Sequence, residues 1–280
     1  MRQRVGPREH FRRGNAATAH RNCRATGGVI LERTVALQTV CLRRLDGNRA
    51  GELDTGRFFA NPKVMPEKIV AGWSLQTGPA CAGRHVLLIE DRCEVMFPTT
   101  AQRRRGLGPV KKGNAHGVLV HAMIAVDADS GSCLGLVGGD VWSRDGVNPV
   151  HHQRRPLAER ESVHWLDTAQ QAKQVVTSAA LMTVVADREA DMYPLWGTVP
   201  DPACHVLTRA LRDRLPVGGG TLFAAAANFP AAGLREIELP ARDPGQRKRS
   251  ALLQLRYGEA EIRRRRMNAT ATCRPACGCV

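Results

Sequence analysis

The sequence has 280 residues, with 41 basic against 26 acidic side chains, a net charge of +15 at pH 7 and a pI of about 10.2. The charge favours polyanions as partners. The hydrophobic content of 43% is enough for a packed core, which aliphatic side chains must build because only 4% of residues are aromatic. No apolar run approaches the roughly 18 residues of a membrane span, so we expect no membrane partner.

The first 50 residues hold eleven arginines, no lysine and three acids (Glu9, Glu32 and Asp46). Apart from a short apolar patch around residues 35–42, they lack the amphipathic period of a DNA-binding helical domain. They also lack the apolar segment of a signal peptide. The cysteines before the C-terminal tail show no pairing pattern, so we expect reduced thiols in a cytoplasm.

From residue 57 the sequence predicts two short helices with a turn at Asn61 and Pro62, Pro66 in the first turn of the second helix, and Phe58 and Phe59 buried. An apolar strand over residues 85–90 follows and ends at Asp91. Two further strands within residues 117–142 are joined by a turn at residues 127–131, which is a hairpin signal.

Helical spacing of apolar side chains between residues 163 and 176 predicts a helix, and a short β-branched strand follows over residues 182–186 and ends at Asp187. Another helix and another strand complete the order strand, strand, strand, helix, strand, helix, strand. The first three strands can form an antiparallel meander, whereas the later ones need helical crossovers and so run parallel. We therefore expect an α/β fold, with a ribonuclease H-like mixed sheet, flanking helices and a partial β-rich insertion over residues 213–264.

Asp91 and Asp187 each terminate an apolar strand at its carboxyl end, where open α/β sheets gather ligands. If the two strands are neighbours, the carboxylates converge and suit Mg²⁺ or Mn²⁺, which can support displacement at phosphorus. An aspartate after a strand is also very often a turn residue or a helix N-cap. The residues alone leave both interpretations open.

The segment "VVADREADMYPLW", residues 184–196, resembles the DREAD signature of cut-and-paste DDE transposases of the insertion-sequence-four family. The similarity extends in order and spacing through "RFFANPKVMPEKIVAGWSLQT", "LLIEDRCEV", the hairpin at residues 117–144, "HVLTRALRDR" and "LREIELPARDPGQRKRSALLQLRYGEAEIRR". It covers roughly residues 53–264, and it implies a catalytic core over residues 53–212.

The resemblance implies that Asp91 and Asp187 are catalytic aspartates that ligate Mg²⁺ or Mn²⁺. It gives Arg209 a contact with transposon-end DNA, with a surface arginine that makes no specific contact as the alternative. A structural role is expected for Arg188, Glu189 and Asp191: Arg188 would pair with an acid across the helix start, and Asp191 would stabilise that start through the helix dipole. It also implies a basic loop that holds DNA phosphates, with a merely solvated loop as the alternative. The loop residues are Arg103, Arg104, Arg105, Lys111 and Lys112.

The chain departs from the family pattern at Arg92 and Cys93, where small hydroxyl residues usually follow the first aspartate. A bulky cation there could perturb the site. The family's third carboxylate, a glutamate on a helix beyond the insertion, has no counterpart. We expect residues 265–280 to be an aberrant cysteine-containing tail, and residues 1–50 to be a basic arm, either disordered or out of frame.

These features imply a transposase-derived protein for DNA transposition, with metal-dependent phosphodiester cleavage and strand transfer impaired by truncation. Its expected partners are terminal-repeat and target DNA, on which it would form a homodimer, and its expected location is the bacterial cytoplasm, with the nucleoid. The alternative is a catalytically inactive DNA-binding remnant that interferes with intact transposase. A generic basic nucleic-acid-binding protein would leave the ordered similarity unexplained.

Overall fold

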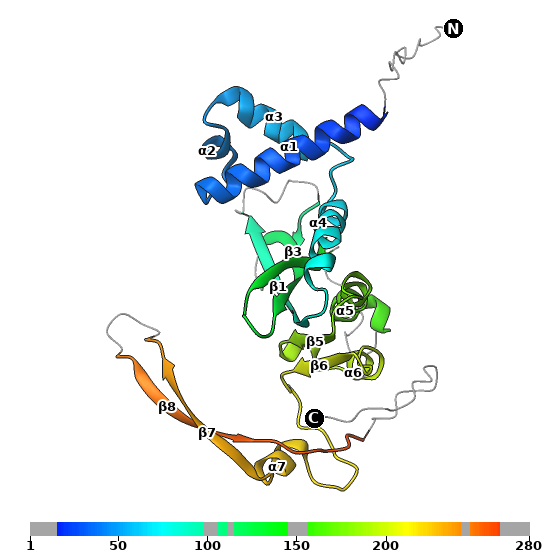
Figure 1. The fold of residues 1–280 in the computed structure, drawn as a ribbon, viewed down its shortest axis with the longest axis vertical. Coiled ribbons are helices and arrows are strands. Elements are labelled where there is room, and N and C mark those ends of the chain that lie inside the picture. Colours follow the sequence, from blue (N-terminus) through cyan, green and yellow to red (C-terminus); the bar gives the residue numbers. More distant parts are fainter. Residues whose placement is uncertain (1–15, 98–105, 111–114, 145–155, 242–246, 264–280) are drawn as a thin grey trace. The chain divides into compact units, whose positions relative to one another are not determined.

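A computed structural model of the chain describes residues 16–97, 106–110, 115–144, 156–241 and 247–263 (Figure 1). The chain divides into two compact units, Met1–Ile69 and Val70–Val280. Within the described ranges, no helix combines the length and apolar character needed to cross a membrane. Five cysteines of the described part are free thiols: Cys41, Cys81, Cys93, Cys133 and Cys204.

The N-terminal unit is helical, with α1 (Ala16–Leu37), α2 (Leu42–Asp46) and α3 (Arg49–Phe59). Gly47, in the left-handed region at φ 65°, ends α2, and the Asn48 side chain caps α3 by accepting from the Gly51 amide at 2.9 Å. An ion pair of 2.7 Å between Arg33 and Asp46 joins α1 to α2. The sequence had led us to expect a basic arm without regular structure here, so residues 16–50 differ from that expectation.

Helix α4 (Pro66–Ala80) begins at the predicted proline. Pro66 suits this place because the first helical turn has no intrahelical partner for its amide nitrogen. Phe58 and Phe59 were both expected to be buried, but Phe58 is half-buried and Phe59 is 50% exposed. Their apolar character alone did not determine which way the side chains face.

The C-terminal unit contains a mixed sheet, built from β1 (His85–Phe97), β2 (Gly108–Pro109), β3 (His116–Asp127), β4 (Cys133–Trp142), β5 (Leu181–Ala186) and β6 (Cys204–Thr208). β3 lies antiparallel to β1, and β4 antiparallel to β3, whereas β1, β5 and β6 run parallel in that order. The short β2 pairs with the start of β3. The predicted meander, followed by parallel strands, is confirmed.

Helix α5 (Val163–Val175) covers one face of this sheet, as predicted from its spacing (Figure 1). Its Trp165 and Ala169 pack in the core with Val86 and Leu88 of β1 and Val184 of β5, and all five are at most 1% exposed. In β1 and β5 the residues between these buried ones point to the opposite face of the sheet. They are only half-buried as far as Asp91 and Asp187. The sheet therefore has a closed face under α5 and a more open face opposite it.

Strand β1 is longer than predicted, because it continues past Asp91 to Phe97. The extension is paired with β3 from Asp91↔Ala122 to Phe97↔His116, and its residues are exposed or half-buried. Charged side chains are tolerated there because the strand has left the core. We had interpreted the first charge as the end of the strand.

The β3–β4 hairpin turn lies at residues 127–131, as predicted. Asp127 accepts the Asp129 amide at 2.9 Å and forms an ion pair with Arg84, while Gly131 takes a φ of 69°. The Asp127 side chain is only 4% exposed, so the contacts that fix the turn are made from the inside of the protein.

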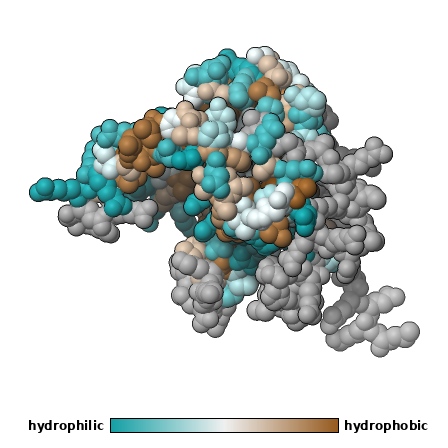
Figure 2. Space-filling model, turned by 90° about the horizontal axis from the view of Figure 1, so that it is seen from below, coloured by the Kyte–Doolittle hydropathy of each residue, from teal (hydrophilic) through white to brown (hydrophobic). Residues whose placement is uncertain are grey.

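The segment after β6 contains α7 (Leu222–Ala227) and a two-stranded antiparallel sheet of β7 (Ala231–Leu239) and β8 (Arg249–Arg256). The two strands lie where the sequence predicted strands, within residues 213–264. Their large apolar side chains are exposed, among them Leu234 at 66% and Leu252 at 68%. Figure 2, which views the molecule from below, shows hydrophobic residues exposed on that face.

Candidate metal and nucleic-acid site

Asp91 and Asp187 lie at the same level of neighbouring parallel strands. The last registered pair of β1 and β5 is Ile89↔Val185, and each aspartate comes two residues later. Side chains two residues apart share a face, and neighbouring strands are about 4.8 Å apart, so the register brings the two carboxylates together on the open face. Both residues are exposed. The register thus places Asp187, which follows the end of β5, at the level of Asp91, which lies within β1 where its pairing with β5 has stopped.

Asp187 also caps a helix. Its Oδ1 accepts the Glu189 amide at 2.7 Å at the start of the 3₁₀ helix η4 (Arg188–Ala190). The Oδ1 of Asp91 accepts the amide of Arg92 at 2.7 Å. The N-cap that we considered as an alternative is therefore present. It does not compete with ligation, because an ionised carboxylate offers two oxygens with several lone pairs.

Arg209 extends the same row. The β5–β6 register ends at Ala186↔Thr208, so the next residues along, Asp187 and Arg209, are neighbours at the edge of the sheet. Arg209 is exposed. A cation beside two carboxylates is suited to a phosphate that approaches the same edge.

The basic loop lies outside the described residues. It comprises Arg103, Arg104, Arg105, Lys111 and Lys112. The tail at residues 265–280 lies outside them as well.

The two aspartates fit one hard divalent cation. Mg²⁺ is commonly held by one or two carboxylates, with waters and substrate phosphates completing its shell. Within the described ranges, no group of three or more His, Cys, Asp or Glu side chains is placed to hold a metal ion. The described residues thus supply a two-carboxylate site, and they offer no candidate for the third carboxylate that the family resemblance implies.

Arg92 points to the closed face of the sheet, away from the side of Asp91. Its guanidinium lies 5.6 Å from the ring centre of Trp165, donates from Nη1 to Glu161 at 2.6 Å and reaches Glu189 Oε2 at 3.0 Å. Arg144 holds the same Glu161 through both of its carboxylate oxygens. These two arginines hold the pKa of Glu161 below its usual value, Arg144 with the larger effect. The charge of Arg92 is thus paired with two acids.

Asp191, the last residue of the signature pentapeptide, is buried in a structural role. It accepts the amides of Leu211 and Arg212 at 2.8 and 3.0 Å, and its Oδ1 accepts Arg214 Nη2 at 2.7 Å. The Arg214 guanidinium also lies 4.3 Å from the ring centre of Tyr193. The expected structural role is confirmed, although Asp191 acts through Arg214 and not through a helix dipole.

Within the same pentapeptide, Glu189 pairs with Arg92, whereas Arg188 is exposed. The pairing confirms a structural role for Glu189. The expected partner of Arg188, an acid across the helix start, is not among the contacts of the described residues.

A buried polar cluster beside the aspartates was missed by the sequence reasoning. Glu90 Oε2 lies 3.1 Å from His121 Nε2, and both side chains are fully buried next to Trp165. Burial raises the pKa of Glu90 to about 9, and burial is also the main cause that lowers the pKa of His121 to about 4. At neutral pH both groups are therefore uncharged, and the protonated carboxyl of Glu90 donates a hydrogen bond to His121 Nε2.

The alternation of buried and half-buried side chains along β1 could have indicated this cluster. Val86, Leu88 and Glu90 alternate along β1, so the carboxyl belongs to the buried face. Glu90 Oε1, His121 Nδ1 and Trp165 Nε1 have no hydrogen-bond partner among the described residues.

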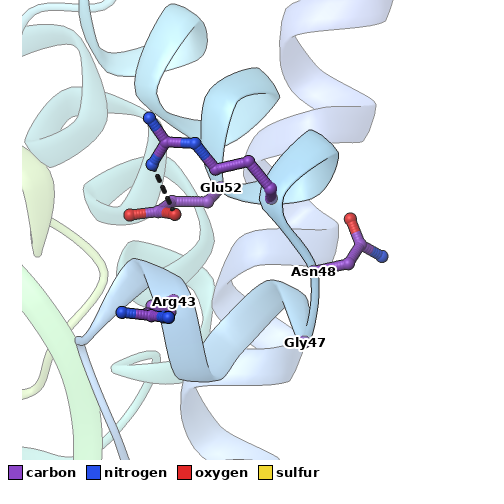
Figure 3. Close-up of a pocket in the computed structure, with 5 residues that line it drawn as sticks. Arg43, Gly47, Asn48 and Glu52 are labelled. Carbon is purple, nitrogen blue, oxygen red and sulfur yellow. Dashed lines mark hydrogen bonds and ion pairs between the residues drawn. The ribbon is translucent and has the colours of Figure 1, made fainter.

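A separate hollow lies in the N-terminal unit, at the corner between α2 and α3 (Figure 3). It is lined by Arg43, Gly47, Asn48, Arg49 and Glu52. Arg49 and Glu52 form an ion pair of 2.9 Å across one turn of α3. Arg43 is the second cation that lines the hollow, and it is not part of this exposed ion pair.

No model of a known protein family matches the chain, and no curated protein matches it. The argument for function therefore depends on the residues described above.

Proposed function

We propose that this protein acts on DNA as a metal-dependent phosphodiester-cleaving enzyme of the DDE transposase kind, with a ribonuclease H-like core. The observation that carries the proposal is the alignment of Asp91 and Asp187 on neighbouring parallel strands. The strand order also supports it, because a three-strand meander continued by parallel strands is the arrangement expected for such a core.

Each residue of the row has a distinct task. Asp91 and Asp187 would hold Mg²⁺ or Mn²⁺ at the open face, and Arg209 would bind a DNA phosphate beside them. The bound metal would supply activation of a water or a 3′-hydroxyl and stabilise the leaving oxygen. Asp187 keeps its orientation through its bond to the Glu189 amide at 2.7 Å. The net charge of +15 would draw the polyanion to the protein.

The experiment is a cleavage assay with Mn²⁺ and DNA that carries the terminal repeats flanking the gene. The matched variant is Asp187→Asn, because asparagine caps a helix start as well as aspartate does but lacks the charge that a metal needs. We expect weak cleavage by the wild type, because two carboxylates stand where the family resemblance implies three, and none by Asp187→Asn. Equal cleavage by both proteins would refute the assignment of Asp187.

The second candidate is a DNA-binding protein that does not cleave. It is favoured by the two-carboxylate site and by the exposed Arg209 at the same edge. In this case the protein binds terminal-repeat DNA with an affinity that falls steeply with salt, and DNA remains intact with Mg²⁺ or Mn²⁺. Such a protein would compete with an active transposase for the same DNA ends.

A further inference from the structure

We infer that Arg92, Glu189 and Glu161 form a clasp that sets the distance between Asp91 and Asp187, which makes Arg92 a positioning residue for the metal. The inference rests on the proposed function, because it concerns the same two aspartates. It assigns a task to Arg92, one of the two residues after Asp91 at which this chain departs from the family pattern.

The clasp joins the two backbone segments that carry the aspartates. Arg92 follows Asp91 directly on β1, and Glu189 follows Asp187 by two residues on η4. Their side chains meet at 3.0 Å between Arg92 Nη2 and Glu189 Oε2. The registered pairing of β1 with β5 stops at Ile89↔Val185, so this ion pair continues the connection where backbone pairing has ended.

Arg92 is itself held in place. Glu161 accepts its Nη1 at 2.6 Å, and only 17% of the Arg92 side chain is exposed. Glu161 is in turn fixed by Arg144, which also donates to the carbonyl of Val110 at 2.7 Å. A planar guanidinium with several donors can bridge two carboxylates at fixed geometry. A shift of Glu189, and with it the η4 segment, would require Arg92 to leave an anchored position.

The geometry separates positioning from simple charge. Asp91 and Arg92 point to opposite faces of β1. If Arg92 acted on the metal by its charge alone, removing it would strengthen cation binding, because a nearby positive charge repels the metal. If it acts by holding the aspartates at the right separation, removing it weakens binding. Partners behind metal ligands typically change affinity by about 10- to 100-fold.

The test measures Mn²⁺ affinity of the full chain by calorimetric titration, with urea unfolding as a second readout. The variants are Arg92→Met, which keeps the length of the side chain over Trp165, Glu189→Gln, and the double variant. We expect about tenfold weaker Mn²⁺ binding for each single variant. The double variant should be no weaker than either, because both changes open the same contact.

The matched control is Arg84→Met, which removes the ion pair with Asp127 at the opposite end of β1. It should lower the urea midpoint and leave Mn²⁺ affinity unchanged. If Arg92→Met does not fold, Arg92→Gln, which also lacks the charge, takes its place. Glu189→Gln can then overturn the clasp but not support it, because losing the Glu189 charge weakens cation binding by itself.

The outcomes distinguish the two levels of the hypothesis. The clasp is overturned, and the proposed function stands, if Arg92→Met binds Mn²⁺ as tightly as the wild type or more tightly. The same conclusion follows if Arg92→Met does not fold and Glu189→Gln binds Mn²⁺ with unchanged affinity. A wild type that binds no Mn²⁺, or binds it equally well after Asp187→Asn, overturns the proposed metal site and the clasp together.

Discussion

Replacing Asp191 with alanine leaves the Arg214 guanidinium charged and unpaired inside the protein. The Asp191 side chain is 0% exposed, the Arg214 side chain is 8% exposed, and their shortest contact is 2.7 Å. Removing one partner of a buried ion pair typically costs about 3–5 kcal/mol. The amides of Leu211 and Arg212 also lose their acceptor, but both residues are exposed and their amides can bind water. We therefore expect a loss of about 4 kcal/mol, set mainly by Arg214.

The assay is equilibrium unfolding in urea, followed by tryptophan fluorescence. Trp196 is a suitable reporter because its ring centre lies 4.4 Å from the Arg214 guanidinium. With a denaturant slope of about 2 kcal/mol per molar urea, a loss of about 4 kcal/mol lowers the midpoint by roughly 2 M. The matched control is Asp167→Ala on α5, where the side chain is exposed. That change should stay within about 0.5 kcal/mol.

A second variant tests the physical reason. In Asp191→Ala with Arg214→Met the unpaired charge is gone, and replacing a buried ion pair by apolar side chains is often close to neutral. We expect the double variant to recover most of the lost midpoint. If Asp191→Ala behaves like Asp167→Ala, or if adding Arg214→Met lowers the midpoint further, the reasoning is refuted.

Three further predictions concern the turn, the insertion and the DNA contact. The hydrogen bond from the Asp129 amide, and to a lesser extent Arg84, lowers the pKa of Asp127. The stabilising effect of the Asp127 carboxylate is therefore present above an ordinary aspartate pKa of about 4 and is lost as pH falls through the lowered pKa. The urea midpoints of wild type and Asp127→Asn should differ at pH 7 and converge at acid pH. A difference of the same size at both pH values would contradict this. Leu252 on β8 is 68% exposed, and Leu252→Lys should reduce self-association of the protein through the β7–β8 hairpin, measured by light scattering. The control Leu211→Lys, at a leucine that is 52% exposed and outside the hairpin, should leave self-association unchanged. Arg209→Ala should lower the slope of log affinity for DNA against log salt by about 1, while Arg209→Lys should keep it.

Strand order and the position of the two aspartates were accessible from sequence because both follow from local patterns. The turn at residues 127–131 carries its own signal in Asp127 and Gly131. The helix between β4 and β5 predicted that β5 runs parallel to a neighbouring strand, since parallel neighbours need a crossover. That this neighbour is β1, which places Asp91 beside Asp187 although 96 residues separate them, came from the structure.

The contacts of Arg92 could not be predicted in this way. Glu161 lies 69 residues along the chain and Glu189 lies 97 residues along, and no local pattern selects one exposed acid over another. Ion pairs of this kind depend on the rotamers of long side chains after the backbone is in place. The sequence showed that Arg92 was unusual, but only the structure showed which acids neutralise it.

The buried Glu90–His121 pair lies between these cases. The alternation along β1 and β3 shows that both side chains face the core. What alternation cannot show is that they meet, because Glu90 is opposite Met123 in the register and reaches His121 diagonally. The partner of a buried polar residue is a property of the assembled sheet.

The pairing of β1 has a consequence for how its backbone opens in solution. From Val86 to Ile89 the strand is hydrogen-bonded on both sides, to β3 and β5, whereas from Asp91 onward only β3 is registered beside it. Amide protons in the doubly paired part should exchange with solvent only on global unfolding, and protection should decline beyond it. Asp91 thus stands at a step in protection, where its backbone is anchored on one side and its segment can adjust locally when a ligand enters.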